Sequence, residues 1–190
     1  ILEEKLTALE GGKGAVVMSS GMAAIANTCM ALLRTGDEFV TGNSLFMSTY
    51  LLFANVFKKY GITARFAEST DLQAIQKAIN NKTRFVFLET IGNPKMDIPD
   101  LAGAAEIAHA HGIPLVVDNT LATPYLCRPI ELGADVVIHS TTKYLSGHGD
   151  AVGGVVIDGG RFSWSKERFP DFEPFIDRKG PLAYLDKVWR

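Results

Sequence analysis

The sequence contains only two cysteines, Cys29 and Cys127, and neither belongs to a CxxC or CxxH pair. Such pairs mark zinc sites and redox centres, so the cysteines predict neither. His109 and His111 lie two positions apart and cannot share one face of a helix, so we expect no metal site there. Cys29 lies in an apolar helical pattern and is expected to be a buried thiol. This use of cysteine fits a reducing cytoplasm.

Long apolar runs and a strong charge of either sign are also absent. No apolar run approaches the roughly 20 residues that a membrane-spanning helix requires, so we expect no membrane partner. A formal net charge of −2 gives no electrostatic reason to expect a nucleic-acid partner. A chain of 190 residues with 47% hydrophobic and 21% charged residues is typical of one globular domain.

Short β-branched runs alternate along the chain with helical patterns, without repeats or low-complexity segments. This alternation predicts the α/β class with a mostly parallel, doubly wound sheet. The helical patterns cover 2–9, 23–33, 50–61, 70–79 and 101–111, and the segment 70–73 resembles a capping box. An irregular aromatic tail is expected from Phe162. The expected strands are 15–18, 39–40, 63–66, 84–88, 115–117, 136–138 and 155–157.

Polar residues follow two of the apolar runs at the point where each ends. Asp118 follows 115–117, and Lys143 comes shortly after 136–138. Ligands of open parallel sheets bind at the carboxyl ends of the strands, so we expect these two side chains at one edge. Pyridoxal phosphate needs a lysine for its Schiff base and an acid beside its ring nitrogen. The pair predicts this cofactor, and the hydroxyls of Ser140 and Thr142 could donate to its phosphate.

The segment Ser20–Met22 predicts a tight turn between a strand and a helix. Such a turn presents free backbone N–H groups and the positive end of the helix dipole, which together favour an anion. The turn therefore predicts an anion site at Ser20, Gly21 and Met22. An ordinary helix cap by Ser20 is the alternative. Asn93 follows another apolar run and is expected at the same edge, whereas Glu89 is expected to brace the edge.

Three segments together resemble the Cys/Met-metabolism (trans-sulfuration) family of pyridoxal-phosphate enzymes. They are SSGMAAI from Ser19, LETIGNP from Leu88 and VVDNTLATPYLCRPIELGADVVIHSTTKYLSGHGD from Val116, and the resemblance extends over most of the chain. The family includes cystathionine synthases and lyases, methionine γ-lyase and O-acetylhomoserine sulfhydrylase.

The resemblance implies the large domain of the fold-type I, aspartate aminotransferase-like enzymes over residues 1–190. It implies that Lys143 and Asp118 are catalytic and that Asn93 contacts the ring hydroxyl of the cofactor. It also implies that Ser20, Gly21 and Met22 hold the phosphate of the cofactor. It also implies that Phe46 stacks on the ring, at a position where the family has a tyrosine. Phenylalanine keeps the stacking but has no ionisable hydroxyl. Tyr50 aligns with a different aromatic residue and is not expected to replace it.

The stretch Gly160–Trp164 is similar to a Gly-x-Phe-x-Trp pattern of O-acetylhomoserine sulfhydrylases. It favours replacement at the γ-carbon of an activated homoserine by sulfide or a thiol, giving homocysteine or methionine. Elimination by a methionine γ-lyase, or a cystathionine-type lyase or synthase reaction, is the alternative. Phe46 leaves a third possibility, a non-catalytic homologue that binds the cofactor.

The resemblance also implies segments that this sequence does not contain. The family's N-terminal arm and its C-terminal small domain, which supplies the arginine for the substrate carboxylate, are both missing. We therefore expect a fragment that is inactive alone, from a homotetramer assembled as a dimer of dimers.

Overall fold

The computed structural model describes residues 1–189, and its centre is one seven-stranded sheet. The strand order is β1-β7-β6-β5-β4-β2-β3. From β6 to β3 all neighbours are parallel, whereas β7 is antiparallel to both β6 and β1. The expected mostly parallel α/β sheet is confirmed. The strands are β1 Gly14–Met18, β2 Glu38–Gly42, β3 Thr63–Ala67, β4 Thr83–Glu89, β5 Leu115–Asp118, β6 Val136–Ser140 and β7 Gly154–Asp158.

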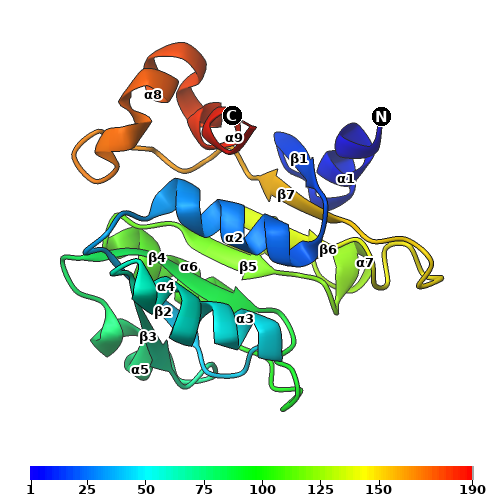
Figure 1. Ribbon diagram of the computed structural model, residues 1–190, viewed down its shortest axis with the longest axis horizontal. Helices are drawn as coiled ribbons and strands as arrows, with labels where there is room; N and C mark the ends of the chain where they lie inside the picture. The colour runs from blue at the N-terminus through cyan, green and yellow to red at the C-terminus, as the bar shows by residue number, and fades with distance from the viewer. Residues whose placement is uncertain (190) are drawn as a thin grey trace.

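Helices cover both faces of the sheet, as a doubly wound fold requires (Figure 1). One face packs against α2, the α3–α4 segment and α9, and the other against α1, α5 and α6. The main helices are α1 Leu2–Glu10, α2 Gly21–Leu32, α3 Met47–Leu51, α4 Phe57–Lys59, α5 Leu72–Ala78, α6 Leu101–Ala110, α7 Thr123–Leu126, α8 Glu173–Lys179 and α9 Ala183–Trp189.

The remaining helical segments are single turns or bulges. A π-helical segment joins α3 to α4, so that one bulged helix runs from 47 to 59, close to the prediction. These segments are η1 Leu52–Val56, η2 Pro129–Leu132, η3 Pro170–Phe172 and η4 Gly180–Leu182. In the described part of the chain no helix has the length and apolar character needed to cross a bilayer.

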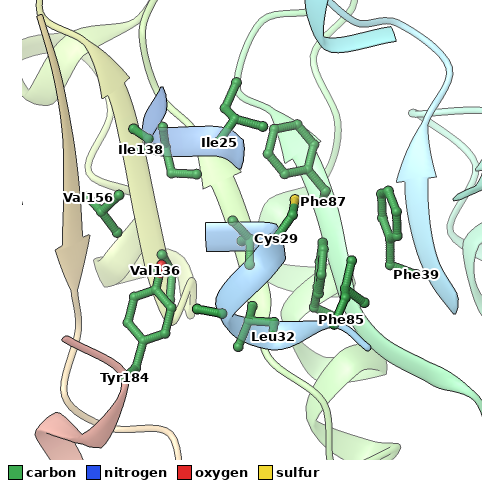
Figure 2. Close-up of a cluster of buried hydrophobic side chains, with 14 of the residues drawn as sticks. Ile25, Cys29, Leu32, Phe39, Phe85, Phe87, Val136, Ile138, Val156 and Tyr184 are labelled. Atoms are coloured by element: carbon green, nitrogen blue, oxygen red, sulfur yellow. The ribbon is translucent and has the colours of Figure 1, made fainter. Parts of the chain in front are cut away.

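The core on the α2 face explains the strand pattern. Successive strand residues point to opposite faces, so the apolar runs of the central strands are buried on both sides. Figure 2 shows Cys29 of α2 among Phe85, Phe87 and Val136 of the sheet, with Tyr184 of α9 nearby. Cys29 is 1% exposed and its thiol is free, which confirms the expected buried cysteine. Burial raises its pKa, so the thiol stays uncharged.

Two local predictions were wrong. Asp71, not Thr70, caps α5, because its Oδ1 accepts the backbone N–H groups of Gln73 and Ala74 at 2.9 and 3.0 Å. The segment from Phe162 to Gly180 is not irregular throughout, since it forms α8 at 173–179. Trp164 stacks there on Phe172 and Tyr184, so the aromatic pattern reflects packing of the chain's last helices onto the core.

Candidate active site

A pocket of about 610 Å³ opens at the carboxyl ends of β4, β5 and β6. We call this side of the sheet the carboxyl edge. The parallel strands all deliver their last residues here, which is why ligands bind at such edges. The pocket is lined by Gly21, Met22, Ile25, Phe46, Thr49, Glu89, Ile91, Asn93, Asp118, Thr120, Leu121, Ser140, Thr142, Lys143, Tyr144, Gly147 and Gly149. All predicted site residues except Ser20 therefore lie together.

Asp118 ends β5 and presents one carboxylate oxygen to the pocket. Its Oδ1 accepts the Thr120 backbone N–H at 2.9 Å and the Thr120 hydroxyl at 2.5 Å. Within residues 1–189 no hydrogen bond reaches Oδ2, so this oxygen remains available to a ligand. Burial raises the pKa of Asp118, although the bonds from Thr120 and the nearby His139 oppose the rise. A cationic ring nitrogen beside Oδ2 would favour the charged carboxylate.

Lys143 lies in the loop that joins β6 to β7. The Gly147 backbone N–H donates to the Lys143 carbonyl at 2.9 Å, and the Ser146 N–H donates to the Thr141 carbonyl at 3.1 Å, so the loop is a compact turn. The side chain of Lys143 is exposed and lines the pocket. The structure thus places an accessible amine and the Asp118 carboxylate in the same pocket.

The N-terminus of α2 supplies the expected anion site. The first backbone N–H groups of a helix have no partner within it, and in α2 those of Gly21 and Met22 are not bonded to any described residue. A Cβ on Gly21 would lie 2.6 Å from the Ser140 Cβ, so only glycine lets α2 approach β6 this closely. The helix end and the Ser140 hydroxyl consequently face one corner of the pocket.

Two predicted phosphate contacts differ in detail from the prediction. The Ser20 hydroxyl accepts the Ala23 backbone N–H at 3.0 Å, and Ser20 does not line the pocket, so its side chain acts as the helix cap that was the alternative. The Thr142 hydroxyl donates to the Gly153 carbonyl at 3.3 Å and accepts the Gly153 N–H at 3.1 Å. Of the two predicted hydroxyls, only that of Ser140 is free for a phosphate.

Phe46 and Asn93 form the wall nearest to β4. Phe46 precedes α3 and is 43% exposed, with its backbone N–H bonded to Glu89 Oε1 at 2.8 Å. Asn93 lies in the loop after β4, and its side-chain amide lines the pocket without a bond to the described residues. An aromatic face and a free amide are suited to a planar ring with a polar substituent.

Sequence reasoning missed Thr120, which fixes Asp118 and also accepts the Ser140 backbone N–H at 2.8 Å. Thr120 thereby connects the ends of β5 and β6. The available signal was its position two residues after an aspartate, the spacing of an Asx turn. The roles of Tyr144, Gly147 and Gly149 in lining the pocket had no separate signal, because they follow from how the β6–β7 loop folds.

These groups fit pyridoxal phosphate, because each part of the cofactor has a matching partner in the pocket. The free Oδ2 of Asp118 suits the ring nitrogen, the amine of Lys143 the aldehyde, and the N-terminus of α2 with Ser140 the phosphate. An α/β pocket with this donor set defines the class of pyridoxal-phosphate enzymes with a parallel-sheet large domain.

The comparison with protein families agrees with this class. Residues 1–175 match the family described as Cys/Met metabolism PLP-dependent enzyme. The chain therefore belongs to this family, and the resemblance found in the sequence is confirmed. The cofactor of this family is pyridoxal phosphate.

Two curated relatives are similar over most of the chain. The homocysteine/cysteine synthase of Saccharomyces cerevisiae is 47% identical over 99% of this chain and 45% of its own length. The L-methionine gamma-lyase of Pseudomonas putida is 46% identical over 83% of this chain and 39% of its own length. The chain thus spans less than half the length of these relatives.

A solved O-acetylhomoserine sulfhydrylase from Wolinella succinogenes has the same fold. Its TM-score is 0.91 at 41% identity, over 99% of this chain and 54% of that one. This likeness confirms the α/β fold of the fold-type I enzymes.

Proposed function

We propose that this chain is the large, cofactor-binding domain of a pyridoxal-phosphate enzyme that replaces the γ-substituent of O-acetylhomoserine with sulfide or a thiol. The observation that supports it most directly is that Lys143 and Asp118 line the same pocket at the carboxyl edge. The reaction is proposed by analogy with the yeast homocysteine/cysteine synthase and the Wolinella O-acetylhomoserine sulfhydrylase. The Gly160–Trp164 pattern agrees with it.

The residues of this chain have distinct tasks in that reaction. When bound, the cofactor acts as an electron sink that makes protons of the amino-acid substrate removable. Asp118 Oδ2 would accept the proton of the ring nitrogen in a hydrogen bond. Lys143 Nζ would hold the aldehyde end of the cofactor and would take and return substrate protons. The α2 N-terminus and Ser140 would hold the phosphate, Phe46 would cover the ring, and Asn93 would bind its hydroxyl.

The test is product analysis with the whole protein. O-acetylhomoserine with sulfide should give homocysteine and acetate, and a Lys143→Ala variant should give neither. Methionine offered alone should stay unchanged. Release of an oxo acid and a thiol from methionine, with no product from O-acetylhomoserine and sulfide, would contradict the proposal.

The second candidate is that elimination reaction, because a methionine gamma-lyase is nearly as similar to this chain as the synthase. Phe46 supports a third candidate, a homologue that binds the cofactor without turnover. Cofactor binding without products from either substrate would identify it.

Small-molecule substrates follow from the relatives' names. We extend the proposal to a cytoplasmic homotetramer, a dimer of dimers, with no nucleic-acid or membrane partner. The free thiols of Cys29 and Cys127 support a reducing compartment. Light scattering of the whole protein would test the tetramer.

A further inference from the structure

Glu89 is the second carboxyl group of the pocket, beside Asp118. It is the last residue of β4 and stands in register opposite Asp118 of β5. Residues in register on neighbouring strands project to the same face, so the two carboxyl groups lie on the same wall. Glu89 is 8% exposed, whereas the amine of Lys143 is open to solvent.

The Glu89 carboxylate is hydrogen-bonded to one loop and lies at the start of another. Its Oε1 accepts the Phe46 N–H at 2.8 Å, at the start of α3. Glu89 also ends β4, directly before the loop that carries Asn93, and the Asn93 backbone lowers the pKa of Glu89. Glu89 therefore lies between the two segments that bring Phe46 and Asn93 to the pocket.

The same two loops pack against each other beside Glu89. A Cβ on Gly92 would lie 2.0 Å from Asp97 Oδ1 and 2.2 Å from Ser44 Oγ, so only glycine allows this approach. The Gly92 N–H donates to the Asp97 carbonyl at 2.8 Å and closes the loop after β4. A displacement of one loop would consequently displace the other.

A buried carboxyl group at this position is electrostatically unfavourable. Burial raises the pKa of Glu89 to about 8, Asp118 and Asp97 add to the rise, and the backbone of the two loops opposes it. An apolar side chain of similar length would avoid this cost but could not accept a backbone N–H. The carboxyl group at this position is therefore explained by its contact with the backbone of these loops.

We propose that Glu89 is a positioning residue that fixes the Phe46 and Asn93 segments against each other and so sets the shape of the cofactor pocket. This inference rests on the proposed function, since it assumes that the pocket holds pyridoxal phosphate. Glu89 acts through the two backbone segments and not on the reacting atoms.

The experiment uses the whole protein and three variants of Glu89. Glu89→Leu removes the acceptor, Glu89→Asp withdraws the carboxylate by one methylene, and Glu89→Gln keeps an acceptor oxygen at the same reach. Asp135→Asn is the matched control, because Asp135 is also buried and accepts a backbone N–H, from Leu115 at 2.8 Å, but lies before β6, away from the carboxyl edge.

Two measurements are made on each protein. Hydrogen exchange of the cofactor-free protein, read by mass spectrometry, reports the protection of segments 44–51 and 90–97. Fluorescence titration with pyridoxal phosphate gives the dissociation constant. Glu89→Leu and Glu89→Asp should speed exchange in both segments and weaken cofactor binding at least about tenfold, whereas Glu89→Gln should stay within about threefold of the parent protein.

The outcomes separate the inference from the proposed function. A parent protein that does not bind pyridoxal phosphate would refute the proposed function, whatever the exchange data show. A parent that binds it, with unchanged exchange in both segments for Glu89→Leu or Glu89→Asp, would overturn the inference. An Asp135→Asn variant that changes the two segments as much as these variants do would overturn it as well. Both Glu89→Leu and Glu89→Asp are made because, if one of them does not fold, the other still tests the inference.

Discussion

Two polar clusters lie next to each other at the ends of β5 and β6 but on opposite faces of the sheet. On the α2 face, Asp118 and Ser140 line the pocket. On the other face, Asn119 and His139, their immediate neighbours in sequence, bind Glu10 of α1. We call Glu10, Asn119 and His139 the Glu10 cluster.

The clusters differ in whether a ligand can reach their polar atoms. In the pocket, Asp118 Oδ2, Ser140 Oγ and the Lys143 amine are left for a ligand. In the Glu10 cluster all three residues are 0% exposed, and Glu10 Oε1 accepts from Asn119 Nδ2 at 2.8 Å and pairs with His139 Nε2 at 2.5 Å. Asn119 Nδ2 also donates to the Cys127 carbonyl at 2.9 Å.

Neighbouring residues of one strand can therefore have different roles, one in ligand binding and the next in the stability of the fold. Side chains alternate between the faces, so Asp118 follows Val116 toward α2, while His139 follows Val137 toward the opposite core. We expect pocket variants to lose function with little loss of stability, and variants of the Glu10 cluster to lose stability first.

The largest expected effect comes from Lys143→Ala in the whole protein. Loss of the amine that attaches the cofactor and moves protons should lower kcat at least about 10⁴-fold. Because Lys143 is exposed, the denaturation midpoint without cofactor should stay the same. Steady-state kinetics measures the loss of kcat, and urea unfolding measures the stability. A loss of stability as large as that of Glu10→Ala would contradict the distinction between the pocket and the Glu10 cluster.

Glu10→Ala should have the largest effect on stability. It leaves His139 buried without its partner, and breaking a buried pair in this way costs about 3–5 kcal/mol. Urea unfolding of the cofactor-free protein measures the loss. A double variant with leucine at both positions should recover most of it. If Glu10→Ala were as stable as the parent protein, the Glu10 cluster would not have the structural role assigned to it.

Stability should also depend on pH through Glu89. Its folded pKa of about 8 exceeds its ordinary value of 4.5, so the folded state binds the proton more tightly. The contribution is complete below pH 4.5 and is lost as the pH rises through 8, at no more than about 1.4 kcal/mol per pH unit. Glu89→Gln should lack this part of the slope. Unfolding free energies from about pH 5 to about pH 9 test it, and parallel curves for both proteins would contradict the shift.

The smallest effect separates the two hydroxyls of the phosphate corner. Ser140→Ala should weaken pyridoxal phosphate binding about tenfold, because a free hydroxyl that bonds a charged group contributes about 1.5 kcal/mol or more. Thr142→Val should weaken it less, since the Thr142 hydroxyl already binds Gly153. Fluorescence titration with pyridoxal phosphate gives the dissociation constants of the two variants. The reverse order would mean that Thr142 turns from Gly153 to the phosphate.

Much of the fold was predictable because its signals are local. Each β-branched run from 39 to 157 became a strand, and Gly21 and Asn93, predicted from the turns that follow strands, line the pocket. The capping of α5 was missed because Thr70 and Asp71 are both good caps, and the choice depends on backbone geometry at the entry to the helix. The helix at 173–179 was missed because its stability comes from packing on the aromatic core.

The sequence by itself determined the strand–helix alternation, the cofactor class and the position of Asp118 and Lys143 at one edge of the sheet, since these depend on short motifs and on the polarity of strand ends. Only the tertiary structure decided that β7 runs antiparallel, that Thr142 binds Gly153 and that Glu10 meets His139. The physical reason is that such contacts join residues whose separation in sequence has no local signal. Their partners are chosen by which faces the packed sheet and helices bring together.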